Sequence, residues 1–231
     1  MMHVRLAAIL FAIALIALMP MRLAAEWAGL DDLGITARTA RGSVWSGTLA
    51  ETRYGGIALG DLDAGIDPLP LFAGRLRIGF EQGESMRGAI SLARGSISTD
   101  DVTARLPLGS TFAPLPLAAL ELDDVNARFR DGACAAAEGR VRAVVDRGAL
   151  GLDLPGGLSG NARCDGDALL LPLASRSAME ALSLRFSADH RWRAELMARP
   201  GDASVRDRLL AAGFARRGGG YGLTVQGMLA N

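Results

Sequence analysis

The stretch Arg75-Leu76-Arg77-Ile78-Gly79-Phe80-Glu81 alternates large apolar residues with charged residues or glycine. Successive side chains of a strand point to opposite faces, so this stretch predicts a strand with one apolar face and one wet face. The same period of two recurs along the chain at Met86, Ile90 and Leu92; Val102 and Leu106; Leu182, Leu184 and Phe186; Trp192, Ala194 and Leu196; and Tyr221, Leu223 and Val225. Most of the chain is therefore expected to be β-sheet.

Short turns separate these predicted strands. Asp67-Pro68-Leu69-Pro70 cannot continue a ladder, and Glu81–Glu84 and Arg94–Ser96 are typical of hairpin loops. A parallel crossover needs about a dozen residues, so neighbouring strands this close are expected to be antiparallel. In Ile57–Asp67 the apolar positions change from odd to even, which predicts a bulge near Gly60. The fold class is thus mainly β, an antiparallel, twisted or curled sheet built from hairpins.

One short helix is expected near the C-terminus, over Asp202 to Ala212. Asp202 is a natural N-cap residue, Val205 and Leu209 share a face, and Gly213 ends the helix. The segment Gly109–Leu120 carries two prolines and stays open between a short helical turn and a covering loop.

Composition excludes one broad class of protein and argues against another. Of the 231 residues 50% are hydrophobic, which excludes a disordered chain. The 25 basic and 25 acidic residues cancel, no lysine occurs, and aromatic residues are 5% of the chain. With no basic stripe and few aromatics for base stacking, nucleic-acid binding is not expected.

The N-terminus predicts a membrane anchor over residues 1–25. Leu6–Met21 contains no charge and as a helix would be about 24 Å long, somewhat less than the hydrocarbon core of a bilayer. Leu23-Ala24-Ala25 would extend the span if Arg22 reaches the interface. A cleavage site after Ala25 would place Leu23 where a small residue is required, so an uncleaved anchor is favoured over a cleaved signal peptide. By the positive-inside rule, residues 26–231 are exported.

The two cysteines, Cys134 and Cys164, both lie in the exported part. An oxidising compartment permits a disulfide, and we predict that they pair; two buried free thiols are the alternative.

The residues offer little for catalysis. His190 is expected to be a solvated turn residue beside Asp189, and Gly157-Leu158-Ser159-Gly160 lacks the pattern of a nucleophile elbow. The absence of lysine excludes a phosphate-binding P-loop and a Schiff base.

The acidic residues offer little for metal binding. Asp61, Asp63 and Asp67 face one side of a strand at a spacing of about 6.5 to 7 Å, too far apart to share one ion unaided. Asp123-Asp124, and Asp165 with Asp167, are expected to be turn acids. No enzyme activity, cofactor or metal is expected.

Arg41-Gly42-Ser43-Val44-Trp45-Ser46-Gly47-Thr48-Leu49 resembles a signature of type II secretion system protein N. Gly60-Asp61-Leu62, Asp67–Leu76, Arg191–Leu196 with Arg199-Pro200-Gly201, and the last stretch, Gly220–Leu229, resemble the same family in the same order. The cysteine pair is not a general feature of that family.

The resemblance implies a single-pass bacterial inner-membrane protein with a periplasmic β-rich domain. It would be a non-enzymatic accessory subunit of the apparatus that exports folded proteins across the outer membrane. Its expected contact surfaces toward other inner-membrane components are sheet edges and the anchor helix. Trp45 is a candidate contact residue; its alternative role is a core aromatic of the first strands.

Two alternatives remain open. The chain also resembles AsmA-like anchored periplasmic proteins, in which an apolar β groove binds or conducts lipid. An exported hydrolase is the third possibility, and it would depend on His190 or Ser159.

Overall fold

The computed structural model describes residues 18–27, 34–146, 148–151, 154 and 156–229, and one antiparallel sheet dominates them. In chain order the strands are β1 (Ile35–Thr36), β2 (Thr39–Ser43), β3 (Ser46–Tyr54), β4 (Ile57–Asp67), β5 (Leu76–Gln82), β6 (Met86–Ala93), β7 (Ser96–Pro107), β8 (Leu117–Arg130), β9 (Ala133–Val145), β10 (Leu158–Asn161), β11 (Arg163–Asp165), β12 (Ala168–Ala174), β13 (Glu180–Phe186), β14 (Arg191–Ala198), β15 (Ala215–Arg217) and β16 (Gly220–Met228). The helices are α2 (Met21–Trp27), α3 (Pro68–Leu71) and α4 (Ala203–Ala211), with a 3-10 turn η1 (Ala149–Gly151).

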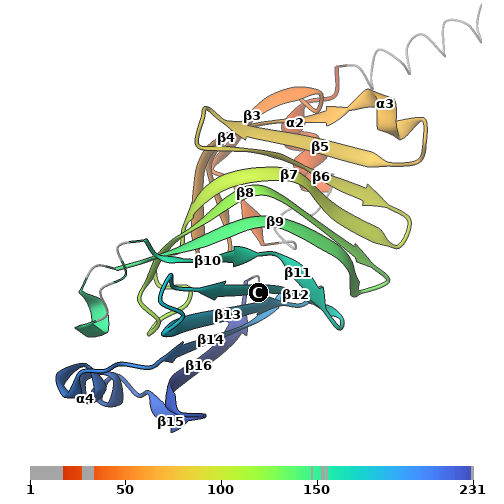
Figure 1. Ribbon diagram of the computed structural model, residues 1–231. Coiled ribbons are helices and arrows are strands. Elements are labelled where there is room, and N and C mark those ends of the chain that lie inside the picture. The colour runs from red at the N-terminus through yellow and green to blue at the C-terminus, as the bar shows by residue number, and fades with distance from the viewer. Residues whose placement is uncertain (1–17, 28–33, 147, 152–153, 155, 230–231) are drawn as a thin grey trace, which may run out of the picture.

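Strand order largely follows the chain. From one edge to the other the sheet runs β1-β3-β4-β5-β6-β7-β8-β9-β10-β12-β13-β14-β16-β15, with β2 paired to β3 and β11 to β12. Figure 1 shows the result, a curled ribbon of strands with β3 at its top and β15 at its bottom. The predicted mainly-β, antiparallel, curled sheet is confirmed, and every stretch of alternating residues lies in a strand. The predicted turn at Asp67–Pro70 begins with the last residue of β4 and continues into the short helix α3.

A pair of bulges bends the first hairpin. The ladder between β3 and β4 shifts register twice between Leu49 and Arg53, opposite Gly60, which confirms the predicted bulge. The second bulge lies in β3, where Glu51 adopts a φ of 50°, and the sequence did not predict it. The Glu51 amide leaves the ladder and donates to Oδ1 of Asp61 at 2.8 Å. A side chain of the neighbouring strand therefore satisfies the displaced amide.

The long central strands repeat this arrangement twice. Asp101 of β7 has a φ of 53° and donates its amide to Oδ1 of Asn126 at 2.9 Å. Asp124 of β8 has a φ of 57° and donates its amide to Oγ1 of Thr103 at 3.3 Å. Asp123 and Asp124 are thus residues of a bulged strand, and the prediction that they lie in a turn is wrong. Bulges increase local twist, and these bulges account for part of the curl.

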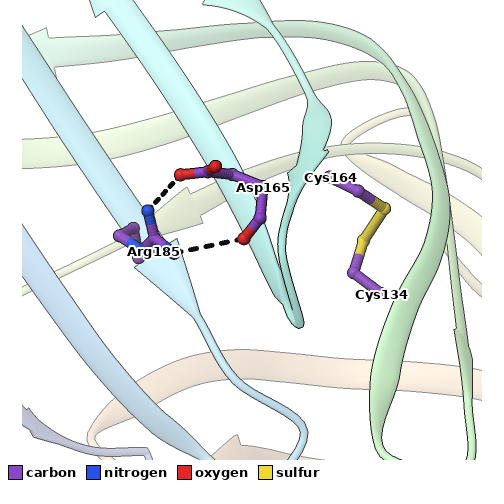
Figure 2. Close-up of a disulfide and its surroundings, with 4 residues drawn as sticks. All are labelled: Cys134, Cys164, Asp165 and Arg185. Atoms are coloured by element: carbon purple, nitrogen blue, oxygen red, sulfur yellow. Dashed lines mark hydrogen bonds and ion pairs between the residues drawn. A yellow bond between two sulfur atoms is a disulfide. The ribbon is translucent and has the colours of Figure 1, made fainter.

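The predicted disulfide between Cys134 and Cys164 is confirmed. It joins β9 to β11, with Cα atoms 5.5 Å apart (Figure 2). The amide of Cys134 also donates to the carbonyl of Asp167 at 2.9 Å. On the other side of the β11–β12 hairpin, Arg185 forms an ion pair with Asp165 and donates to its carbonyl at 3.1 Å (Figure 2). The hairpin is therefore fastened to strands on both sides.

The largest core fills the concave side of the C-terminal half. Leu108, Phe112 and Leu115, from the segment between β7 and β8, are buried against the sheet. The Phe112 ring meets that of Trp192 with centroids 4.5 Å apart. Leu209 of α4 is fully buried in the same cluster. The proline-bearing segment before β8 is thus a covering loop, and its last residues start that strand.

The predicted C-terminal helix is confirmed as α4. Asp202 holds the N-cap position with an extended backbone, but its side chain makes no capping hydrogen bond. The first helical turn closes instead through the Arg206 amide, which donates to the Asp202 carbonyl at 3.2 Å.

The predicted membrane anchor covers residues 1–25, of which residues 1–17 lie outside the described residues. Pro20 bridges to Ser43 of β2, and the Val44 amide donates to the carbonyl of Met19 at 3.1 Å. The helix α2 begins only at Met21, so Leu23–Ala25 do not extend a continuous span as predicted; Pro20 lacks the amide that helix continuation requires. In the part of the chain that the structure describes, no helix is both long and apolar enough to cross a bilayer.

Candidate interaction surfaces

Trp45 lies in the tight turn between β2 and β3. Its carbonyl oxygen occupies the space that a Cβ at Gly65 would need, and the neighbouring Val44 carbonyl accepts from the Ile66 amide at 2.8 Å. Glycine at position 65 therefore lets the turn pack directly on β4. Trp45 itself is half-buried and lines a hollow together with Gly65 and Gly79. Its role as a partner contact stays a prediction.

His190 lies in the turn between β13 and β14 with a φ of 64°, which confirms the turn. It is half-buried, however, and its Nδ1 lies 3.2 Å from the hydroxyl of Tyr54 at the end of β3. The prediction of a solvated side chain is therefore wrong, because the curl of the sheet brings the first hairpin over this turn. No local sequence signal indicates a contact across 136 residues.

Asp189 is the charged member of this turn. Its carboxylate accepts from Nε of Arg191 at 2.6 Å. This hydrogen bond from Arg191 lowers the pKa of Asp189 and raises the pKa of Arg191. The Asp189 carboxylate thus interacts with Arg191, whereas the His190 ring lies against the hydroxyl of Tyr54.

The three aspartates of β4 each have a separate partner. Asp61 accepts from the Glu51 amide, Asp63 accepts from the Thr48 hydroxyl at 2.9 Å, and Asp67 lies 3.4 Å from Arg77. No group of three or more metal-ligating side chains occurs among the described residues.

Ser159 lies within β10. It pairs with Arg142 on one side and with Ala174 on the other. A residue inside a paired strand does not have the exposed geometry of a nucleophile at a strand-to-helix turn.

The last long strand presents an open edge. β16 pairs with β14 from Tyr221 to Met228, whereas β15 covers only Gly220, Tyr221 and Gly222 on the other side. For residues 223–228 the structure shows no strand partner on that side within its described ranges. An open strand edge offers unpaired backbone groups to an incoming strand.

Arginines flank this edge. Arg199, Arg206, Arg216 and Arg217 line one hollow beside α4, and no carboxylate lines it with them. Arg216 lies over the ring of Tyr221 at 5.9 Å, and Arg217 reaches Glu195 at 3.7 Å. The open edge therefore ends in a cationic surface.

A row of apolar side chains crosses the inner face of the N-terminal half. Leu76, Leu92, Ile97, Phe129 and Cys134 are direct cross-strand neighbours from β5 to β9. They share the face of Phe80, which packs on the smaller core of this half. Ile97 is 55% exposed, so this rim of the apolar face is incompletely covered.

A comparison with models of protein families shows to which family the chain belongs. The profile described as type II secretion system (T2SS), protein N matches residues 33–224. The chain belongs to the type II secretion system protein N family. No curated protein and no solved structure matches the chain.

The matched region spans nearly the whole sheet, from before β1 into β16. It contains the Trp45 turn, both cysteines and the Tyr54–His190 contact. As a member of this family the chain has a role in type II secretion. The structure adds the open β16 edge and the exposed apolar rim, neither of which the sequence pattern indicated.

Proposed function

We propose that the chain is an accessory inner-membrane subunit of the type II secretion system that acts through protein contacts and has no catalytic activity of its own. Family membership supports the secretion role. The uncharged N-terminal stretch supports an anchor, with residues 26–231 in the periplasm. The partners would be other inner-membrane components of the same apparatus.

The observation that carries the mode of action is the open edge of β16. A partner strand that adds beside residues 223–228 gains main-chain hydrogen bonds, while side-chain complementarity supplies specificity. Because the edge ends in the surface of Arg199, Arg206, Arg216 and Arg217, the best partner strand carries acidic residues.

Site-specific photocrosslinking in cells tests this mode. A photoreactive amino acid at Gln226, exposed on β16, is expected to crosslink to secretion subunits. The matched control is Arg142, which is exposed but lies on β9 between two paired strands. Equal crosslinking from both positions, or none to secretion subunits from Gln226, would contradict docking at this edge.

The exposed rim favours a second candidate function, in which the apolar face binds or conducts lipid. The large core of the C-terminal half is closed by Leu108, Phe112 and Leu115, so lipid would have to lie against the row that contains Ile97. Mass spectrometry of lipid retained by Ile97→Asp tests this candidate, with Leu210→Asp on α4 as control. Stoichiometric phospholipid in the parent protein and in the control, but not in Ile97→Asp, would favour lipid binding.

A further inference from the structure

The helix α3 ends in an exposed apolar tip. We define the α3 tip as Leu69, Leu71 and Phe72; Leu69 is 79% exposed and Phe72 is 92% exposed. Clustered exposed apolar side chains of this kind mark interaction sites, because single scattered residues are common but contiguous ones are not.

The backbone of the tip is fixed. The Phe72 amide donates to the Leu69 carbonyl at 3.2 Å, and the amides of Ala73 and Arg75 both donate to the Pro70 carbonyl at 3.0 Å. The tip is therefore presented in one conformation rather than as a loose loop.

The tip lies at the end of the molecule where the described chain begins (Figure 1). Val44 connects the two: its amide donates to Met19, and its carbonyl accepts from Ile66, two residues before α3. Leu18, the first described residue, is 77% exposed at this end. Since the carbonyl of Met19 is already bonded to Val44, the apolar N-terminal stretch leads without a spacer into the end of the sheet that carries the α3 tip.

The short length of the uncharged N-terminal stretch also places the α3 tip close to the membrane. With Met19 bonded to Val44 and Pro20 bridged to Ser43, the uncharged residues left for a span are Leu6–Leu18, which as a helix would be about 20 Å long. This is shorter than the roughly 30 Å hydrocarbon core, and bilayers accommodate a short span by local thinning, so protein directly beside the span lies close to the lipid interface.

The charges beside the tip suit a lipid surface. Arg75 follows the tip, is exposed, and has no carboxylate partner among the described side chains. The nearby Asp67 is paired with Arg77 at 3.4 Å. Apolar side chains flanked by arginine are typical of segments that lie in the membrane interface and meet anionic headgroups.

We infer that the α3 tip inserts into the interfacial region of the membrane that holds the N-terminal stretch, and so fixes the orientation of the sheet on the bilayer. This inference rests on the proposed anchoring. It adds a second membrane contact, which would restrict rotation of the domain about its anchor and direct the open β16 edge away from the lipid.

An environment-sensitive fluorophore in the full-length chain tests the inference. Phe72→Cys is labelled with NBD without reductant, when the disulfide-bonded cysteines do not react, and the protein is reconstituted into vesicles of phosphatidylethanolamine and phosphatidylglycerol. Leu210→Cys is the matched control, because it is also an exposed apolar residue but lies on α4, far from α3 (Figure 1). The label at position 72 is expected to show blue-shifted emission that shallow nitroxide-labelled lipids quench strongly, and the label at 210 is expected to show neither.

Alkaline extraction of the same vesicles separates this inference from the proposed anchor. If the protein resists extraction but the label at position 72 is not quenched, the contact between the α3 tip and the lipid would be overturned while the anchor stands. That result would favour a protein partner at the tip. Protein that is extracted would overturn the anchor, whatever the label shows. A signal that appears only at high protein-to-lipid ratio would indicate contact between copies of the chain and would also overturn the lipid contact.

Discussion

The hydroxyl of Tyr54 and Nδ1 of His190 lie 3.2 Å apart although 136 residues separate them. The contact joins the tip of the first long hairpin to the turn between β13 and β14. Beside it, the Leu229 amide donates to the His190 carbonyl at 3.0 Å, and the Leu229 carbonyl packs against Gly55. The curl of the sheet therefore brings the β3–β4 hairpin close to the end of β16 at this point.

The Tyr54 phenol gives this contact a pH dependence. Burial raises the pKa of Tyr54 above its usual 10.0, so the folded protein holds the phenolic proton more tightly than the unfolded chain does. The resulting stability is fully present below pH 10 and is lost as the pH rises through the folded-state pKa. Tyr54→Phe is expected to flatten the loss of unfolding free energy above pH 10 in denaturant titrations. An identical alkaline slope in both proteins would refute this role.

The Tyr54–His190 contact itself is measurable by a double-mutant cycle. Tyr54→Phe combined with His190→Asn, which tolerates a positive φ, is expected to show a coupling of about 0.5 to 1.5 kcal/mol at neutral pH. Additive effects would mean that the two side chains do not interact in solution.

The Cys134–Cys164 bond closes a loop with a sequence separation of 30 residues. In the chain-entropy model its loss costs about 3 to 4 kcal/mol, which chemical denaturation with and without reductant measures. The Cys134→Ala/Cys164→Ala variant serves as control, since reductant is expected to leave its stability unchanged. Alkylation of both cysteines in unfolded, unreduced protein would show that the bond is absent.

Because Glu51 has a positive φ, glycine at this position is expected to give a more stable protein than alanine does. Both Glu51→Gly and Glu51→Ala remove the exposed ion pair with Arg38, but only glycine relieves the left-handed backbone. We expect Glu51→Gly to be more stable than Glu51→Ala by about 1 kcal/mol in thermal or denaturant unfolding. A less stable glycine variant would argue against a bulge at this position.

Two phenylalanines are expected to respond in opposite ways to truncation. Phe112 is buried against Trp192, so Phe112→Ala is expected to cost about 3 to 5 kcal/mol of stability. Phe72 is almost fully exposed, so Phe72→Ser is expected to change the stability of the detergent-solubilised protein by no more than about 0.5 kcal/mol. Comparable losses in both variants would mean that the α3 tip packs inside the fold.

Strands and bulges that depend on residues close together in the sequence were predictable from the sequence pattern. Alternation at Leu76, Ile78 and Phe80 predicted β5, and the change of phase near Gly60 predicted its bulge, because strand period and glycine freedom act within a few residues. The cysteine pair was predictable from the compartment that the N-terminus implies.

Contacts that depend on the curl were not predictable. Gly109–Leu120 has no period, yet Phe112 and Leu115 fill the concave side, because the curvature of distant strands creates the space that they occupy. The bulges at Asp101 and Asp124 have no local sequence signal, because their amides bond to Asn126 and Thr103, each on the neighbouring strand. The open β16 edge likewise emerges only when strand order is known.

The most direct test of the secretion role is purification of the tagged full-length protein in a gentle detergent, with mass spectrometry of the proteins and lipids that accompany it. The account predicts reproducible recovery of type II secretion inner-membrane subunits, without stoichiometric lipid. Stoichiometric phospholipid with no secretion subunit would contradict it and would assign the apolar face of the sheet to lipid binding.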